Sequence, residues 1–500
     1  MVQEYDLCVI GGGINGAGIA RDAAGRGLKV FLAEKGDIAG ATSSASTKLI
    51  HGGLRYLEHF EFGLVRDSLR ERETLLTIAP HLVRPRSFIL PHDPKRRSYW
   101  LVGLGLTLYD RLARRKRLPR SRRVKFEQDE TPLKDIYAKG FCYWDCWTDD
   151  SRLVTLNMLD AAEHGAVIAP HTEVVGLKAQ GERWRVYLKD AKGTREIDAA
   201  MVVNATGPWV RNVIDRFGLA ASDTPQVKLV KGSHIIVRKA YGGDDAFLLQ
   251  QADNRVVFII PYEGDFTLIG TTEEAFSESD PADPQISDKE IEYLCSAFNT
   301  SFNKTIAKED VLWTFSGVRP LFDDGKQNAS AVTRDFRLYK HEGLGAPFLS
   351  IFGGKLTTYR TLSEKAVTMI GSELEQPAEP WTAKEPLPGG DIAHGDLRVF
   401  MEKKGLQYDW LLPAMLRRYA HSYGARMDRF LDGAKSLKDL GQYFGDELYE
   451  AEVTYLVRNE WAREAEDILW RRTKVGLRAS EQTVKNLEKA LPKIIEKALS

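Results

Sequence analysis

Basic side chains and histidines stand in short segments whose glycine and hydroxyl residues shape the backbone. His51 and Arg55 lie four residues apart in KLIHGGLRY, so that one helical turn presents both side chains. Arg319 lies in SGVRPL and Lys355 in FGGKLTT. An arginine fork donates two parallel hydrogen bonds to a phosphate, and histidine is the usual general base near neutral pH. These residue types predict a site that binds an oxyanion and takes up a proton.

Two histidines are candidates for the base. His51 lies in a glycine-containing loop, and His234 lies in KGSHIIV at the start of a predicted strand. We favour His51 as the base and His234 as a hydrogen-bonding residue on the substrate side. The exchanged roles stay open, as does a His234 that is only a satisfied core residue.

The N-terminal segment has the order strand, glycine turn, helix, strand. YDLCVI is followed by Gly11, Gly13 and Gly16 in the G-x-G-x-x-G register, and KVFLAE ends in Glu34. Gly11 permits a tight turn, Gly13 lets the backbone approach a pyrophosphate, and Gly16 allows close helix–strand packing. The helix N-terminus offers N–H groups to phosphates, and Glu34 suits a ribose. The order predicts a dinucleotide site without separating NAD from FAD.

Three further segments separate the two dinucleotides. AMVVNATGPW at 200–209 ends a strand in Ala-Thr-Gly, SIFGGKLTT follows at 350–358, and ATSSASTKLIHGG is rich in hydroxyl groups. Together with the glycine turn they resemble FAD-dependent oxidoreductases of the glutathione-reductase-like type. In those proteins such elements hold the adenosine, the pyrophosphate and the flavin, and HTEV at 171–174 resembles the strand that meets the adenine. The predicted cofactor is FAD. Its predicted contacts are Gly11, Gly13, Ile14, Asn15, Gly16, Glu34, Lys35, Thr42, Ser43, Ser44, Thr47, Lys48, Leu49, Val174, Ala205, Thr206, Gly207, Trp209, Gly317, Arg319, Gly354, Lys355, Leu356, Thr357 and Thr358.

Longer strings occur in one order along most of the chain. They include TSSASTKLIHGGLRYLEHFEFGLV, WTDDSRLV, NATGPWV, KGSHIIV, WTFSGVRPL, FGGKLTTYR and EAEVTYLVRNEWAREAEDILWRRTKVGL. With these strings the chain resembles the flavin-linked glycerol-3-phosphate dehydrogenases of the bacterial aerobic respiratory type. The resemblance implies oxidation of glycerol 3-phosphate to dihydroxyacetone phosphate, hydride transfer to FAD, and a membrane quinone as acceptor. The implied catalytic residues are His51, His234, Arg319 and Lys355. The implied substrate-binding residues are Arg55, Tyr56, His234, Arg319, Arg334 and Lys355.

The strand and helix patterns predict an α/β fold with an added α-helical domain. We expect a glutathione-reductase-like FAD-binding domain with an inserted antiparallel-sheet substrate domain and a C-terminal helical domain. β-Branched runs separated by Gly, Asp and Asn turns cover 226–275, and WTAKEPLPGG predicts a linker before a region of helical spacing. The expected FAD-binding domain is discontinuous, with residues 1–80, 140–225 and 330–380. The substrate-binding and membrane-facing regions are 81–139 and 226–329, and the helical domain is 388–500.

An apolar segment flanked by basic clusters points to a bilayer surface. YWLVGLGLTLY at 99–109 is too short to span a membrane, and KRR precedes it while DRLARRKRLPRSRRVK follows it. We expect a cytoplasmic protein attached peripherally to the inner face of the plasma membrane through residues 95–125. The alternative is a buried helix beside a solvated basic loop. No recognition motif accompanies the charge, so no nucleic-acid partner is expected.

Cysteine usage indicates a reducing compartment and no metal centre. The four cysteines suggest no disulfide framework, and the CxxxC pair Cys142 and Cys146 lacks a second pair of zinc ligands. The helical domain is expected to pack on the flavin domain or to form a contact in a homodimer. The rival functions are an oxidase of the same substrate that uses oxygen, an amine or amino-acid oxidase, and a non-catalytic flavin-binding protein at a membrane.

Overall fold

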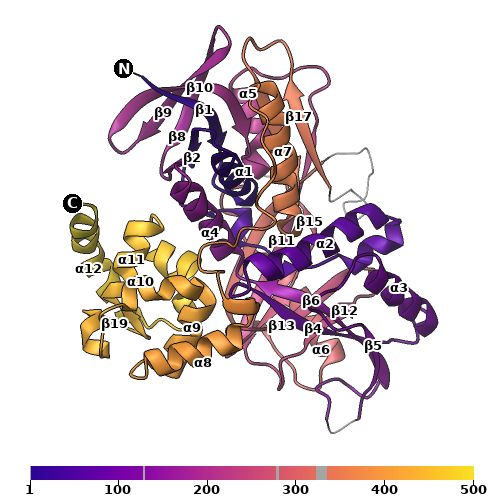
Figure 1. The fold of residues 1–500 in the computed structure, drawn as a ribbon. Helices are drawn as coiled ribbons and strands as arrows, with labels where there is room; N and C mark the ends of the chain where they lie inside the picture. Colours follow the sequence, from indigo (N-terminus) through magenta and orange to yellow (C-terminus); the bar gives the residue numbers. More distant parts are fainter. Residues whose placement is uncertain (1, 128–129, 278–280, 323–334) are drawn as a thin grey trace.

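The computed structural model describes residues 2–127, 130–277, 281–322 and 335–500. Two β-sheet layers lie one above the other in Figure 1, and a helical domain lies beside them. Within the described residues, no helix combines the length and apolar character needed to cross a membrane.

The first sheet is mostly parallel and contains the strand that precedes the glycine turn. Val9 pairs with Leu32 on one side and with Val203 on the other, so the turn after Ile10 meets the ends of both neighbouring strands. An antiparallel hairpin over residues 183–204 leads into the Ala-Thr-Gly segment. The strands in spatial order are β17 (Phe336–His341), β18 (Phe348–Gly353), β10 (Gly193–Asn204), β1 (Gln3–Ile10), β2 (Val30–Ala33) and β7 (Val167–Ala169), with β8 (Glu173–Gln180) and β9 (Arg183–Asp190) added beside β10.

Alternating side chains cover the two faces of this sheet. On one face Leu7 and Val9 pack against α1 (Ile14–Gly25), α4 (Asp150–Glu163) and α7 (Tyr359–Glu373). On the other face Cys8 and Ile10 pack toward α5 (Val210–Arg216) and the β8–β9 hairpin. Because side chains alternate along β1, the strand is buried on both faces of the sheet. The glycine turn that follows it leads directly into α1, which packs on one of these faces.

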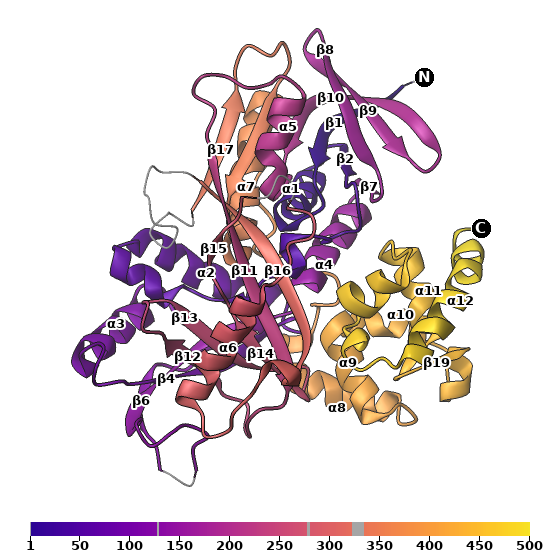
Figure 2. The ribbon, with the colours of Figure 1, turned by 180° about the vertical axis from the view of Figure 1, so that it is seen from behind.

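The second sheet forms the wall opposite the glycine turn. Its strands in spatial order are β15 (Glu274–Ala275), β11 (Val227–Arg238), β14 (Phe266–Gly270), β13 (Val256–Tyr262), β12 (Ala246–Gln250), β4 (Val83–Pro91), β6 (Lys139–Thr148) and β3 (Leu49–Ile50). β16 (Val311–Phe322) pairs with β11, and β5 (Arg122–Lys125) pairs with β6. The antiparallel pattern expected over 226–275 is confirmed. Seen from behind in Figure 2, β11 and β16 extend toward the first sheet.

One strand lies in a different layer from the one expected. The range 140–225 is assigned to the flavin domain by sequence, but β6 pairs with β4 over residues 140–148 in the second sheet. The aromatic and branched residues of β6 indicate a strand, but they do not indicate its partner, which is fixed by tertiary pairing.

The second sheet carries α6 (Asp288–Ser301) on one face. The other face carries α2 (Phe62–Ile78) and α3 (Tyr99–Arg111).

The C-terminal domain is a cluster of helices with its own apolar core. Its helices are α8 (Leu397–Gln407), α9 (Pro413–Tyr423), α10 (Asp428–Leu431), α11 (Glu450–Asn459) and α12 (Glu481–Leu499). A short hairpin, β19 (Tyr443–Gly445) and β20 (Leu448–Tyr449), interrupts the helical pattern. The preceding linker is pinned by Trp381, whose ring lies where a Cβ on Gly25 would stand. The linker is thus held against α1.

Candidate functional site

One cavity between the two sheets contains most of the residues whose chemistry the sequence singles out. Glycines of the first sheet line one end, the loop 42–49 lines one side, and β13 and β16 of the second sheet close it. The side chain of Phe258 faces this cavity, whereas the next residue, Ile259, faces α6. The cavity therefore lies on the face of the second sheet away from α6.

The glycine turn is packed so closely that it admits no side chain at two positions. A Cβ on Gly16 would lie 1.9 Å from the carbonyl oxygen of Gly11. A Cβ on Gly11 would lie 2.7 Å from that of Ala205, and its φ of +112° disfavours any other residue. Gly13 is the N-cap of α1 and has no side chain to cap the helix, and the first turn contains no acidic residue. The N–H groups and the positive dipole end of this turn suit a pyrophosphate.

Beyond this turn Glu34 ends β2 in position for a ribose. Its carboxylate accepts hydrogen bonds from the backbone N–H groups of Gly12, at 2.6 Å, and Gly36, at 2.8 Å. Each carboxylate oxygen retains a further lone pair for a ribose hydroxyl. The ammonium of Lys35 stands 4.2 Å from the centre of the Trp209 ring, and Val174 is buried in the same cluster as Ala33. These groups fit the adenosine end of FAD.

At the other end of the predicted FAD site, two glycines at the end of β18 and the hydroxyl-rich loop 42–49 line the same cavity. Gly353 and Gly354 adopt φ of 72° and 94°, and the Asn15 side-chain amide donates to the Gly353 carbonyl at 3.2 Å. Ser43 accepts a hydrogen bond from the N–H of Ile14 at 3.0 Å, which ties the loop to the start of α1. The described residues thus fit FAD along its whole length, with the flavin end in the cavity.

A pair of arginines lies at the flavin end and is bridged by an acid that the sequence reasoning missed. Arg55 and Arg319 approach the two carboxylate oxygens of Glu273 at 3.7 and 3.9 Å. Arg319 also donates to the Thr271 hydroxyl at 3.3 Å. The ammonium of Lys355 is 3.4 Å from the carbonyl oxygen of His51. Three cationic side chains therefore converge on a region suited to a phosphate.

His51 lines this cavity, and its imidazole is neutral. Burial, followed by the positive charges of Lys355 and Arg72, lowers the pKa of His51 to about 3. The backbone N–H of His51 donates to the hydroxyl of Thr357 at 3.2 Å, which fixes the residue beside the Gly353–Gly354 turn. A neutral imidazole is the form that accepts a proton.

His234 lies behind the cavity wall rather than on it. Its ring stacks on Phe315 with centroids 4.7 Å apart, and its Nε2 is 3.0 Å from the hydroxyl of Thr47. Thr47 lines the cavity, and His234 is not among the lining residues described. Burial, then Arg319 and Lys48, holds the pKa of His234 well below its ordinary value.

The structure brings together much of the predicted set in one cavity. The predicted residues that line it are Gly13, Ile14, Asn15, Thr42, Ser43, Thr47, Leu49, His51, Arg55, Tyr56, Ala205, Gly317, Arg319, Gly354, Lys355, Leu356 and Thr357. Ser44 and Lys48 face the other side of their loop, and Arg334 lies outside the described residues. The residues missed include Tyr143, Leu248, Phe258, Thr271 and Glu273. Only GTTEE, with its adjacent hydroxyl and acidic groups, carries a local chemical signal for them.

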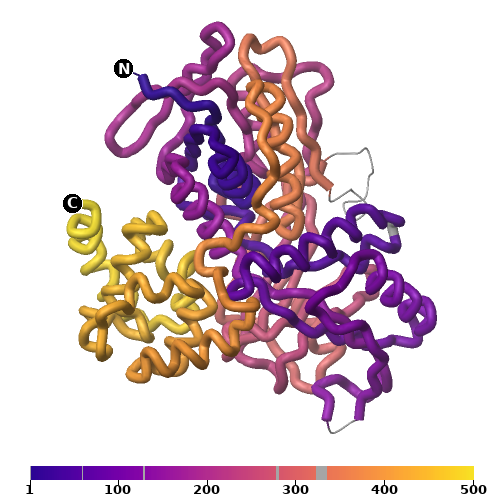
Figure 3. Tube along the Cα trace, in the orientation of Figure 1, coloured from indigo at the N-terminus to yellow at the C-terminus, as the bar shows by residue number. Residues whose placement is uncertain are grey.

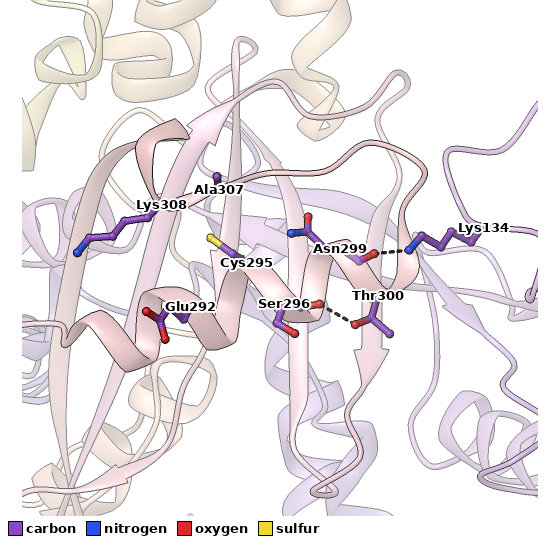
Figure 4. Close-up of a pocket in the computed structure, with 8 residues that line it drawn as sticks. All are labelled: Lys134, Glu292, Cys295, Ser296, Asn299, Thr300, Ala307 and Lys308. Atoms are coloured by element: carbon purple, nitrogen blue, oxygen red, sulfur yellow. Dashed lines mark hydrogen bonds between the residues drawn. The ribbon is translucent and has the colours of Figure 1, made fainter.

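A second hollow lies on α6, on the far face of the second sheet (Figure 4). Its floor is stabilised by the ammonium of Lys134, which donates to the carbonyl oxygen of Asn299 at 2.6 Å. Cys295 lies in it as a buried free thiol. Among the described residues, the hollow and the cavity that contains His51 and the arginines share no lining residue.

The fold and the cavity define a flavin-dependent oxidoreductase with a cationic pocket beside the flavin end. Residues 6–360 match the family model described as FAD dependent oxidoreductase, and residues 380–499 match the C-terminal domain of alpha-glycerophosphate oxidase. The chain belongs to the FAD-dependent oxidoreductase family, in the group that contains the bacterial glycerol-3-phosphate dehydrogenases.

Individual relatives cover nearly the whole chain. The D-erythritol 1-phosphate dehydrogenase of Brucella abortus is 52% identical over 96% of both chains. The glycerol-3-phosphate dehydrogenase of Pseudomonas aeruginosa is 48% identical over 95% of this chain and 93% of its own. The solved glycerol-3-phosphate dehydrogenase of Bacillus halodurans, complexed with FAD, is 28% identical and superimposes with a TM-score of 0.75 over 99% of this chain and 95% of its own.

Proposed function

We propose that the protein oxidises sn-glycerol 3-phosphate to dihydroxyacetone phosphate and passes the electrons through FAD to a membrane quinone. One observation carries this proposal. A single cavity joins the glycine cradle to Arg55, Arg319, Lys355 and the neutral His51. A phosphorylated secondary alcohol needs this combination, because its phosphate needs cations and its hydroxyl needs a base.

Each side chain has a role in this reaction. Arg55 and Arg319 bind the phosphate, Lys355 neutralises charge next to the flavin, and Tyr56 donates a hydroxyl hydrogen bond. His51 takes the proton of the C2 hydroxyl as the C2 hydride leaves, and His234 orients Thr47 from behind the wall. The bound FAD supplies a two-electron acceptor for that hydride. Arg334 lies in a segment that resembles those lining the substrate pocket in this family, and we propose it as a third phosphate ligand.

Anaerobic reduction of the flavin tests the proposal. Mixing the purified holoprotein with glycerol 3-phosphate should bleach the oxidised flavin absorbance, and the same concentration of glycerol should not. A flavin that stays oxidised with glycerol 3-phosphate but is reduced by dithionite would contradict the proposal. Reduction by amines or amino acids instead would favour the amino-acid oxidase alternative.

A second phosphorylated polyol is a candidate substrate. The relative with 52% identity is a D-erythritol 1-phosphate dehydrogenase, and it matches 96% of this chain. The two substrates share a phosphate and a secondary alcohol, so the same arginines and the same base serve both. Comparing kcat/KM for glycerol 3-phosphate and D-erythritol 1-phosphate in one preparation decides between them. At least a tenfold preference identifies the substrate.

The apolar helix α3 supports the membrane part of the proposal. Trp100, Leu101 and Leu104 are exposed, with Trp100 70% exposed and Leu104 66% exposed, while Leu106 and Tyr109 anchor the helix inside. The exposure of these side chains favours the membrane-facing interpretation of α3 over the buried-helix alternative. The surrounding basic residues are also exposed, namely Lys95, Arg96, Arg111, Arg114, Lys116, Arg117, Arg120, Arg122, Arg123 and Lys125. An apolar face with a basic rim suits anionic lipid, and a lipid-bound enzyme reaches a quinone directly.

The electron acceptor is tested separately from the substrate. A dehydrogenase that uses quinone should turn over rapidly with a short-chain quinone and release little peroxide in air. Peroxide released at the rate of substrate oxidation would instead favour an oxidase. Vesicle binding without any reduction by substrate would favour the non-catalytic alternative.

A further inference from the structure

The C-terminal domain contacts α4 at several places, and one short segment, Asp467–Lys474, also reaches the loops of the flavin site. Residues Asp467–Arg472 form a π-helix, and Lys474 follows with a left-handed φ of 59°. π-Helical turns are rare and are concentrated at functional sites. The C-terminal domain lies beside α4 in Figure 3, and the π-helix contacts that helix.

Lys474 anchors this segment on the first turn of α4. Its buried ammonium lies 3.0 Å from the Asp149 carboxylate and 2.6 Å from the Ser151 hydroxyl. Asp149 caps α4 by accepting a hydrogen bond from the N–H of Arg152 at 3.1 Å. The attraction of opposite charges in a buried setting fixes where α4 begins.

The next residue of α4, Asp150, braces the loop 42–48 from behind. Its fully buried carboxylate accepts hydrogen bonds from the ammonium of Lys48 at 2.7 Å and from the Ser46 hydroxyl at 2.7 Å. The Lys48 ammonium also donates to the carbonyl oxygen of Ser44 at 3.0 Å. One ion pair therefore closes the loop on itself and attaches it to the turn that Lys474 holds.

The front of the same loop reaches three parts of the site. Ser43 accepts from the N–H of Ile14 at the glycine cradle, at 3.0 Å. Thr42 donates to the Val318 carbonyl, one residue before Arg319, at 2.7 Å. Thr47 contacts His234 at 3.0 Å. A displacement of the loop therefore shifts three parts of the site together. These are the glycine turn, the strand that carries Arg319, and the side chain of His234.

The same C-terminal segment also holds the adenosine side of the cradle. Arg471 and Arg472 contact the two oxygens of Asp37 at 2.6 to 2.8 Å. Asp37 follows Glu34 in the loop after β2. One segment of the C-terminal domain thus fixes loops at both ends of the dinucleotide site.

We propose that Lys474 is a positioning residue that couples docking of the C-terminal domain to FAD binding. It holds Asp149 and the start of α4, and Asp150 and Lys48 then hold the loop 42–48 against the flavin. The inference rests on FAD as the cofactor and does not depend on which polyol phosphate is oxidised. It gives the C-terminal domain a role in cofactor binding.

The test measures the dissociation constant of FAD for the full-length protein after removal of flavin, by titration of flavin fluorescence. Lys474→Met should weaken FAD binding at least tenfold. The double variant Lys474→Met/Asp149→Asn removes both charges and leaves no buried carboxylate unpaired, and it should weaken binding equally. Lys485→Met is the matched control, because Lys485 is an exposed lysine of α12 in the same domain. The visible absorption spectrum of the bound flavin should shift in the two Lys474 variants only.

A second control separates positioning from a general loss of stability. Ile494→Ala removes a buried side chain from the core of the C-terminal domain, far from the loop 42–48 in sequence. FAD binding that is at least tenfold weaker in the double variant than in an Ile494→Ala protein of equal melting temperature supports the proposal. Equal FAD affinities in these two proteins, or a double variant within twofold of wild type, would overturn it. Failure of both polyol phosphates to reduce the flavin would leave this test intact.

Discussion

The hydroxyl of Thr47 lies 3.0 Å from Nε2 of His234, and only Thr47 of this pair lines the cavity. His234 therefore reaches the site through a hydroxyl group, whereas His51 lines the cavity itself. This relationship separates two histidines that are equivalent candidates by residue type. It favours His51 as the base.

Replacement of each histidine should consequently have a different effect. His51→Ala should slow anaerobic flavin reduction by about 10²- to 10⁴-fold, the usual loss on removing a general base. His234→Ala removes one hydrogen bond to Thr47 and should slow it by about tenfold or less. Stopped-flow absorbance measures both rates, and dithionite reduction verifies that each variant retains flavin. Equal losses would leave the assignment of His51 unsupported.

The proposed role of Arg319 in phosphate binding predicts that its replacement lowers kcat/KM only for a phosphorylated substrate. Arg319→Lys keeps the charge but loses the planar fork, so kcat/KM for glycerol 3-phosphate should fall about 10- to 100-fold. Glycerol has no phosphate, so any slow flavin reduction by concentrated glycerol should be unchanged. An equal loss with glycerol would assign Arg319 to the structure of the wall instead.

The glycine turn and the rest of the cavity differ in how far the sequence alone defines them. Gly11, Gly16 and Glu34 lie within one strand–turn–helix–strand unit, so local spacing predicts their arrangement. Phe258 on β13 and Glu273, three residues after β14, reach the same cavity only because β13 and β14 pair. Their local sequence indicates strands, but the register that turns Phe258 inward is a tertiary property.

The close packing of the glycine turn predicts that one added methyl group prevents FAD binding. Gly16→Ala places a Cβ 1.9 Å from the backbone oxygen of Gly11, and backbone atoms of a buried turn have little room to shift. The variant should purify without FAD, as judged by its absorbance. Gly63→Ala is the control, since a Cβ there meets no atom of the described residues within 4 Å, and it should keep full flavin content. A flavin-replete Gly16→Ala protein would contradict this view of the turn.

The buried side chain of His81 is expected to make the folded protein less stable in mild acid. It is 0% exposed, and burial, followed by the charge of Arg152, lowers its pKa to about 3. The unfolded chain takes up a proton near the ordinary histidine pKa of about 6.5, so stability is present above that pH and is lost as the pH falls toward 3. Between pH 7 and 5 the loss is about 2 kcal/mol for this residue.

Comparison with His81→Leu measures this contribution. The variant should lose less melting temperature between pH 7 and 5 than the wild type does. Some loss should remain, because the pKa of the buried His421 is also held well below its ordinary value, first by burial and then by Arg84. Parallel losses in the two proteins would show that His81 takes up its proton as readily in the folded protein as in the unfolded chain, and would contradict its lowered pKa.

The exposed face of α3 predicts binding to anionic vesicles with two separable contributions. Trp100 and Leu104 supply apolar area, worth about 1.5–3 kcal/mol for each side chain that is fully buried. The basic rim contributes about 1 kcal/mol per residue near the surface, and salt screens only that part. Trp100→Ser/Leu104→Ser should therefore weaken sedimentation with vesicles at least tenfold at both low and high salt. Leu406→Ser is the control, because Leu406 is 85% exposed on α8 of the C-terminal domain and should not change binding. Flavin reduction by substrate in solution should be equal in both variants, so a double variant that still binds vesicles as wild type does would place the membrane contact elsewhere.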